Sequence, residues 1–281
     1  MRVGVDTKYK PCVLALTVVT RGPVLARVRV AHAFMPNTNF TDREGTVDGE
    51  RTFYVHMPRT PQTVVVNVYN KAVGDQPAGR DKTIMIKEYK LLPLDTFPQI
   101  YDSKNPLIQE GVKFIEEFSE RAAILSAGEI GSVYRSDHGR FRIDYLDHIR
   151  DRREFIPDKA NGGLVPNPRL GEIQSTPARI SRDRGIIEWS KPHCIRYAVP
   201  YRVGISAHEI GHFYINENPR DEFEADENGI NIMIGKGYGY IDVCNAFLSV
   251  FESSPTDQNA DRAKKVIEQV EKLERKYNRY K

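Results

Sequence analysis

The chain has 281 residues, of which 40% are hydrophobic, and a formal net charge of +3. It is therefore long enough for one large domain or two smaller ones with a packed core. The small charge and the absence of basic blocks with interleaved aromatic residues argue against nucleic acid as a partner, and no apolar run reaches membrane-spanning length. Cys12, Cys194 and Cys244 lie far apart and fit neither a disulfide framework nor a thiolate metal site.

An apolar run near the N-terminus, residues 12–19, follows two lysines and resembles the core of a secretory signal. No cleavage site of small residues follows it, and residues 20–23 have the composition of a turn. We therefore expect a buried strand here and a cytoplasmic protein. A virion-associated protein is the alternative if the chain is viral.

The first third of the chain consists of short runs rich in Val, Ile, Thr and aromatic residues, which indicate strands. These runs cover residues 12–20, 24–31, 51–57, 63–69 and 83–90, and the turn clusters between them cover 36–39, 44–49 and 74–79. The spacing predicts a small antiparallel β-sandwich or barrel, the accessory domain, over residues 1–92. It carries no catalytic pattern, so we expect it to serve docking or targeting and to bind an assembly partner.

A proline-containing linker, residues 93–105, is predicted to separate this domain from the remainder, residues 106–281. The first element there is a helix over 106–126, because Val112, Ile115, Phe118 and Ala122 recur at steps of three and four. Further expected elements are a strand over 140–146, a loop over 157–177, and a hairpin of 178–181 with 185–190. Of that hairpin, Ile186–Trp189 is our candidate for a strand at the edge of a substrate cleft, with an ordinary core strand as the equal alternative.

The next segment contains His208-Glu209-Ile210-Gly211-His212. On a helix, residues four apart project from one face, so His208 and His212 can bind one metal ion with Glu209 beside them. Gly211 costs about 1 kcal/mol in a helix relative to alanine, and its small size would let another segment come close. The competing interpretation is an exposed helix with incidental His and Glu residues.

A catalytic zinc ion usually takes three protein ligands, so a third ligand is expected soon after this helix. Residues 216–221 read as a turn, and Pro219 suits the first position of a new helix. Glu222 and Asp226 lie four apart on that helix. Glu222 could bind the metal while Asp226 accepts a hydrogen bond from the outer nitrogen of His208. A solvated acidic helix face is the alternative for this run.

After this run, the glycine-rich residues 235–240 predict a flexible connection, and residues 244–251 and 257–277 predict two helices. Val266, Val270, Leu273 and Tyr277 form an apolar stripe on the second of these helices.

The two motifs, H-E-x-x-H at 208–212 and E-x-x-x-D at 222–226, resemble those of the gluzincin clan of zinc metallopeptidases. The closest likeness is to compact bacterial and phage enzymes bearing E-F-x-A-D, and it extends over about residues 105–250. The resemblance implies an α+β, zincin-like catalytic domain with Zn²⁺ held by His208, His212 and Glu222, Glu209 as base and Asp226 behind His208. Only nine residues separate His212 from Glu222, fewer than in most of the clan. This spacing leaves Glu224 or Asp221 open as the third ligand.

The predicted function is a zinc-dependent peptidase acting on peptide or protein substrates. Zinc would polarise the scissile carbonyl and acidify a water, and Glu209 would move the proton to the leaving amine. A second donor for the oxyanion is required; the candidates by type are His193, Tyr197, Tyr201, Tyr238 and Tyr240, which the sequence does not rank. The alternative function is a structural or assembly protein, such as a phage virion component, that retains the zincin-like domain as a scaffold.

Overall fold

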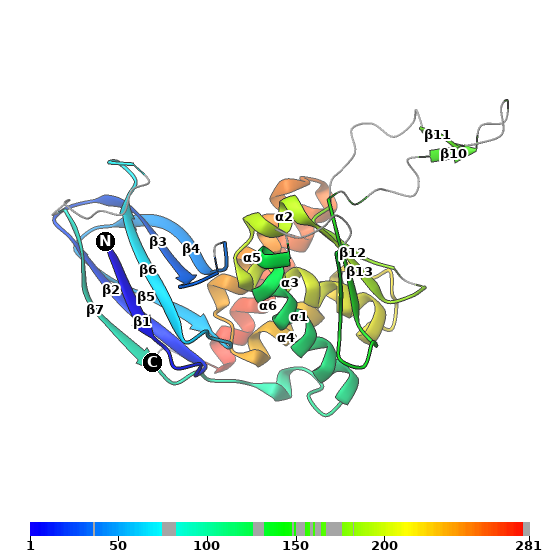
Figure 1. The fold of residues 1–281 in the computed structure, drawn as a ribbon, viewed down its shortest axis with the longest axis horizontal. Helices are drawn as coiled ribbons and strands as arrows, with labels where there is room; N and C mark the ends of the chain where they lie inside the picture. The colour runs from blue at the N-terminus through cyan, green and yellow to red at the C-terminus, as the bar shows by residue number, and fades with distance from the viewer. Residues whose placement is uncertain are drawn as a thin grey trace.

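The computed structural model describes residues 1–281 except 36, 75–82, 126–131, 148, 150–154, 158–159, 161–163, 167–175, 182 and 278–281. The described chain is a mixed α+β protein, with a β-rich part at one side and six α-helices and a smaller sheet at the other (Figure 1). None of the helices among the described residues is long and apolar enough to cross a membrane.

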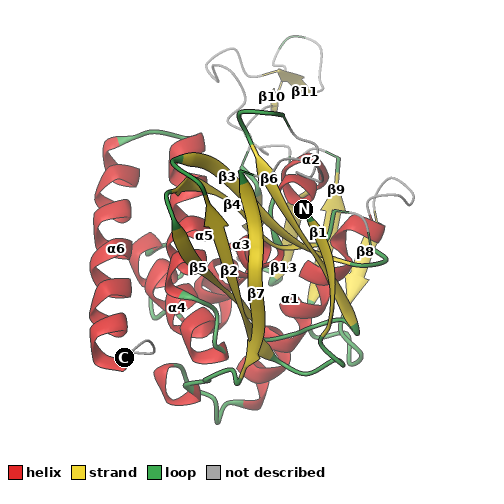
Figure 2. Ribbon diagram, turned by 90° about the vertical axis from the view of Figure 1, so that its left-hand side faces the viewer, coloured by secondary structure: helices red, strands yellow, loops and turns green. Residues whose placement is uncertain are grey.

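The β-rich part is made of two sheets with strand orders β1-β6-β3-β4 and β5-β2-β7. Its strands are β1 (Arg2–Asp6), β2 (Cys12–Thr20), β3 (Val24–His32), β4 (Asn39–Val47), β5 (Glu50–Met57), β6 (Thr63–Asn70) and β7 (Ile84–Leu92). All strand pairs are antiparallel. Alternate residues of β2 and β6, such as Leu14, Leu16 and Val66, are fully buried, as expected where one face of each strand points into a core. The two sheets face one another (Figure 2), so this part is a sandwich.

All five predicted strands of this part are confirmed, but two further strands were missed. Strand β4 includes Glu44 to Val47, which we expected to form a turn. It pairs with β3 from Val24↔Val47 to Ala31↔Asn39, and this long ladder outweighs the local preference of Gly45 for a turn. The turn is reduced to two residues ending at Gly49, which has a φ of 73°. Strand β1 was missed because its five residues carry no distinctive pattern beyond their pairing with β6.

The remainder of the chain combines helices with a second four-stranded sheet. Its elements are the 3₁₀-helix η1 (Pro98–Ile100), α1 (Pro106–Leu125), β8 (Ser132–Arg135), β9 (Arg142–Leu146), β10 (Phe155–Pro157), β11 (Leu164–Pro166), β12 (Ala178–Ile180), β13 (Ile186–Ser190), α2 (Lys191–Arg196), α3 (Val199–Ile210), the π-helical turn η3 (Gly211–Ile215), α4 (Glu222–Lys236), α5 (Tyr240–Ser253) and α6 (Asp257–Tyr277). The sheet has the order β12-β13-β9-β8, and only its central pair, β13 with β9, is parallel. β10 and β11 form a separate antiparallel pair.

Helix α1 packs against this sheet through its predicted apolar stripe, whose four members are all buried. Phe118 contacts Tyr145 on β9 edge to face and lies 6.3 Å, between ring centroids, from Trp189 on β13. Trp189 is fully buried, and its indole N–H donates to the hydroxyl of Ser206 on α3 at 2.9 Å. These contacts fix α3 behind the sheet.

Of the two alternatives for residues 186–189, the ordinary core strand with a buried Trp189 is confirmed, and the strand at the edge of a cleft is not. β13 lies between β12 and β9. β12 pairs with the side of β13 that would have to be free at a cleft, so β12 is the edge strand of the sheet. The glycine-rich segment also differs from expectation: Gly235 and Lys236 end α4, Gly237 caps it with a φ of 97°, and Tyr238 is buried. Most of the loop expected over 157–177 lies outside the described residues.

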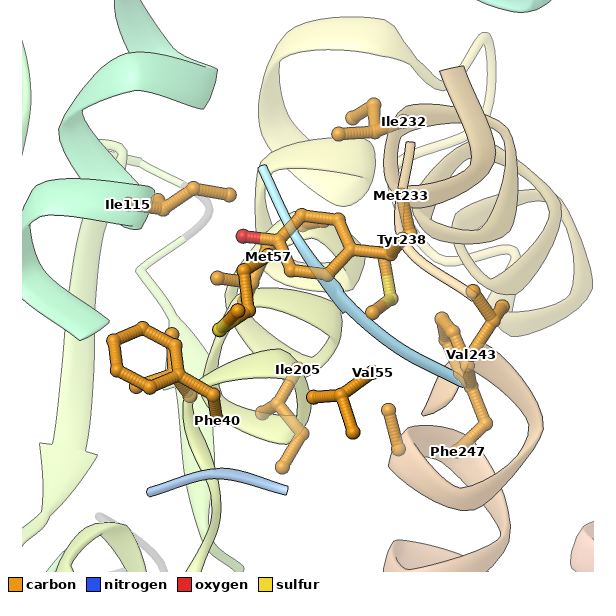
Figure 3. Packing of buried hydrophobic residues seen from close by; sticks show 14 of the residues in the cluster. Phe40, Val55, Met57, Ile115, Ile205, Ile232, Met233, Tyr238, Val243 and Phe247 are labelled. Carbon is orange, nitrogen blue, oxygen red and sulfur yellow. The ribbon is translucent and has the colours of Figure 1, made fainter. Parts of the chain in front are cut away.

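The sandwich and the helices share one apolar core. Figure 3 shows Phe40, Val55 and Met57 of the sandwich packed among Ile115 of α1, Ile205 of α3 and side chains of α4 and α5. The segment predicted as a linker also packs here: the amide of Phe97 donates to the carbonyl of Gly235 at 2.6 Å. The sandwich is therefore held firmly against the helices that carry the candidate site.

Candidate metal centre

Helix α3 and the π-helical turn that continues it hold the two histidines of the motif. His208 and His212 lie one turn apart, with their ring centroids 4.6 Å apart and their planes at 86°. Their Nε2 atoms are 3.0 Å apart, so both rings point the same nitrogen at one place. His212 is 3% exposed, and α3 is buried on almost every side. The helix is therefore buried and not exposed, unlike in the alternative interpretation of the motif.

Helix α4 supplies Glu222 as its first residue. The carboxylate of Asp221 caps the helix by accepting hydrogen bonds from the amides of Phe223 and Glu224. The helix therefore begins three positions later than Pro219, the start that we expected. Oε2 of Glu222 lies 3.3 Å from Nε2 of His208 and 3.5 Å from Nε2 of His212.

The two other candidates for a third ligand are engaged elsewhere. The carboxylate of Glu224 accepts hydrogen bonds from the amides of Glu217 and Asn218, which ties the turn before α4. Asp221 is committed to capping the helix. Of the three acidic residues considered, only Glu222 faces the histidines.

Glycines allow α3 and α4 to approach closely enough for these three side chains to meet. A Cβ atom on Gly211 would lie 3.2 Å from Cα and 3.3 Å from the carbonyl oxygen of Ala225 on α4. On the opposite helix, a Cβ atom on Gly229 would lie 3.2 Å from the backbone nitrogen of His208. Gly211 therefore has the space-saving role that its position in the motif predicts.

The spacing of the three ligand atoms fits a tetrahedral zinc ion. Bonds of about 2.0–2.1 Å in tetrahedral arrangement place any two ligand atoms about 3.3 Å apart. The observed separations among Nε2 of His208, Nε2 of His212 and Oε2 of Glu222 are 3.0, 3.3 and 3.5 Å. Two imidazoles and one carboxylate are also the donor set of a known class of catalytic zinc sites. These residues could therefore hold zinc.

Asp226 and Arg262 support the histidine from behind. Oδ1 of Asp226 lies 2.9 Å from Nδ1 of His208, as the spacing of the E-x-x-x-D run predicts. Arg262 on α6 donates to both oxygens of Asp226, at 2.7 and 2.8 Å, and its third nitrogen lies 3.4 Å from Oε2 of Glu222. Such contacts fix the tautomer and direction of a metal-binding imidazole.

Charge at the site changes the pKa values of its groups. Burial would lower the pKa of His208, but the contacts with Asp226 and Glu222 outweigh burial and raise this pKa to about 9. Hydrogen bonds with His208 and His212 hold the pKa of Glu222 below its usual range, and hydrogen bonds with Arg262 and His208 do the same for the pKa of Asp226, both against the effect of burial. The carboxylates therefore stay ionised and present negative charge to a cation.

Glu209 lies beside the histidines in a cavity of about 230 Å³. It is 8% exposed, and burial raises its pKa. Burial outweighs the opposite effects of His208, His212 and the nearby backbone of Ile180 on β12, which lower this pKa. The cavity is therefore lined by a carboxylate of raised pKa on one side and by the edge strand on another.

Several lining residues were not among the site residues predicted from the sequence. They are residues 176–180, on β12 and just before it, the α5 residues Phe247, Val250 and Phe251, and Arg262. Arg262 is one of many charges on an amphipathic helix, and only tertiary packing distinguishes it.

The five oxyanion-donor candidates do not line this cavity. Tyr238 instead donates to Glu116, Tyr240 donates to the carbonyl of Leu273, and Nδ1 of His193 lies 2.8 Å from the hydroxyl of Ser190. Arg262 is the cationic group nearest the three ligand atoms among the residues that do line it.

Comparison with models of protein families, with curated proteins and with solved structures gives no match to this chain.

Proposed function

We propose that the protein is a zinc-dependent peptidase of zincin-like architecture that cleaves peptide bonds at the cavity between β12 and α3. The observation that carries the proposal is the convergence of His208, His212 and Glu222 at tetrahedral spacing beside Glu209. The grouping draws residues from two helices and one turn, and both histidine side chains are largely buried, with exposed fractions of 12% for His208 and 4% for His212. A site of this composition is typical of hydrolytic zinc enzymes.

Each residue has a role that follows from its position. When bound, zinc would supply Lewis-acid chemistry by polarising the scissile carbonyl and acidifying a water molecule. Glu209 would accept the proton of the attacking water and deliver it to the leaving amine, since its carboxylate faces the same cavity. Asp226 and Arg262 would hold His208 in the orientation that keeps Nε2 toward the cavity.

Extended polypeptide is the substrate that the edge strand favours. The amide of Ser181 donates a hydrogen bond to the carbonyl of Ile186 on β13. Backbone amides of successive residues in a strand point to opposite sides, so the amide of Ile180 points away from β13 and toward the cavity. Main-chain groups on such an edge pair with an extended peptide with little dependence on its sequence.

The test combines metal analysis with proteolysis of the full chain. We expect one zinc per chain and cleavage of an unfolded protein such as reduced casein. Glu209→Gln should retain the zinc and abolish cleavage, whereas His212→Ala should lose both. Glu224→Gln is the matched control, because that carboxylate caps the turn and should leave both properties unchanged.

Absence of stoichiometric zinc in the wild type, even after reconstitution, would refute the metal centre. Zinc binding without cleavage, with loss of folding on chelation, would instead favour the scaffold function.

A further inference from the structure

A second and larger cavity lies between the sandwich and the helices. Its volume is about 630 Å³, within the range of pockets that take small molecules or peptide side chains, about 300–1,000 Å³. One wall is formed by β4 and β5, and the other by α5 and α6, which lie beside that edge of the sandwich in Figure 2. It shares no lining residue with the cavity at the metal centre.

Aromatic and aliphatic side chains line much of this cavity. Phe53 and Tyr54 lie on the sheet side, and Ile241 and Leu248 lie on α5. Ile241 is 59% exposed and Tyr54 is 38% exposed, so apolar surface is open to solvent on both walls. Apolar surface gathered in a concave site, rather than scattered singly, marks a binding surface.

The basic side chains of the cavity are already engaged. Arg43 forms an ion pair with the buried Asp242, and Arg51 donates to the carbonyl of Thr46 while its guanidinium lies 5.4 Å from the ring centroid of Phe53. The acidic residues of the same wall are paired with cations.

Asp42 accepts two hydrogen bonds from Arg27, and Glu44 lies 3.4 Å from Nζ of Lys71.

The helical wall differs, because Glu252 on α5 and Glu274 on α6 are exposed and have no cationic partner among the described residues. Two carboxylates and the exposed ring of Tyr54 line the same cavity, an environment that a lysine or arginine side chain satisfies by ion pairing and cation–π contact.

We propose that this cavity binds a polypeptide segment carrying a basic side chain next to an aromatic or aliphatic one. Helix α5 separates it from the metal centre: Leu248 and Glu252 line this cavity, while Phe247 and Phe251 line the other. A segment bound here would press on the helix that forms a wall of the candidate active site. Binding at this cavity does not depend on zinc.

The test is calorimetric titration of the full chain carrying Glu209→Gln, which prevents hydrolysis of the probe. The probe is a capped tetrapeptide of phenylalanine, lysine, leucine and lysine, with glutamate in place of both lysines in the control peptide. We expect one basic peptide per chain. We expect the double substitution Glu252→Lys with Glu274→Lys to raise its Kd by about tenfold or more, since both carboxylates contact the cation.

The matched control is Glu217→Lys with Asp261→Lys, which changes the net charge equally at exposed positions that line neither this cavity nor the one at the metal centre. Tyr54→Ala is a second, uncharged variant and should also weaken binding. No binding of the basic peptide at millimolar concentration, equal binding of the acidic peptide, or equal Kd values for the two double variants would overturn the proposal. If the peptide bound at the metal centre instead, the two double variants would have equal Kd values.

Discussion

Arg202 on α3 is a fully buried arginine that holds three separate segments together, and its replacement gives the sharpest test of the fold. Its guanidinium donates to the carbonyls of Cys194 at 2.8 Å, Ser119 at 2.7 Å and Asn37 at 3.0 Å. These acceptors belong to α2, α1 and the loop between β3 and β4 of the sandwich. We predict that Arg202→Met strongly destabilises the protein.

The magnitude follows from two opposing effects. Three hydrogen bonds from a charged donor contribute about 1.5–3 kcal/mol each, so their loss costs roughly 4–9 kcal/mol. Methionine carries no charge into the interior, which recovers several kcal/mol of desolvation. The three carbonyl groups stay buried without their donor, so the net effect is still destabilising. We expect the free energy of unfolding to fall by about 3 kcal/mol. For a urea m-value of about 3 kcal/mol/M, the midpoint would fall by roughly 1 M.

Urea unfolding followed by the fluorescence of Trp189 measures this shift, since Trp189 is the single tryptophan and is fully buried behind α3. Arg202→Lys should also be destabilised, because one ammonium group cannot reach three diverging carbonyls. Arg29→Met is the control: Arg29 is half-buried and makes one side-chain hydrogen bond to a described residue, Asn39, so its loss should cost about 1 kcal/mol. If Arg202→Met unfolds at the same midpoint as this control, our account of how the two parts are joined is wrong.

Three further predictions concern packing, pH and thiol reactivity. Gly211→Ala should weaken zinc binding in a chelator competition, because the new Cβ atom would lie 3.2 Å from Cα of Ala225 and push α4 away; unchanged affinity with higher stability would contradict this. Burial raises the pKa of Glu116, so the folded chain holds that proton more tightly than the unfolded chain. The stability of the wild type relative to Glu116→Gln, from urea curves, should therefore increase as pH falls from about 7 to 4; a pH-independent difference would refute it. Burial raises the pKa values of Cys194 and Cys244 to about 11, so at about pH 8 iodoacetamide should modify both on the order of a hundredfold more slowly than an open thiol, as followed by mass spectrometry. Rapid labelling of the folded chain would show that these thiols are accessible.

The sequence by itself predicted the features that depend on local periodicity. The stripe on α1, the strands of the sandwich other than β1 and β4, and the helix over 257–277 follow from residue spacing alone. The approach of His208 to His212 also follows, because one helical turn separates them whatever the rest of the fold does. The sequence likewise predicted that Asp226 would lie behind His208, once Glu222 was taken as the residue facing the histidines.

Only the tertiary structure decided which of three acidic residues faces the histidines, which strand lies at the sheet edge, and that Arg262 belongs to the site. Glu222 and not Glu224 faces the histidines because the cap at Asp221 fixes where α4 begins, and so fixes the side of the helix on which each residue lies. β12 became the edge strand through pairing, and Arg262 arrives from a helix 36 residues beyond Asp226. These outcomes depend on contacts between segments distant in the chain, and no pattern within a single segment encodes such contacts.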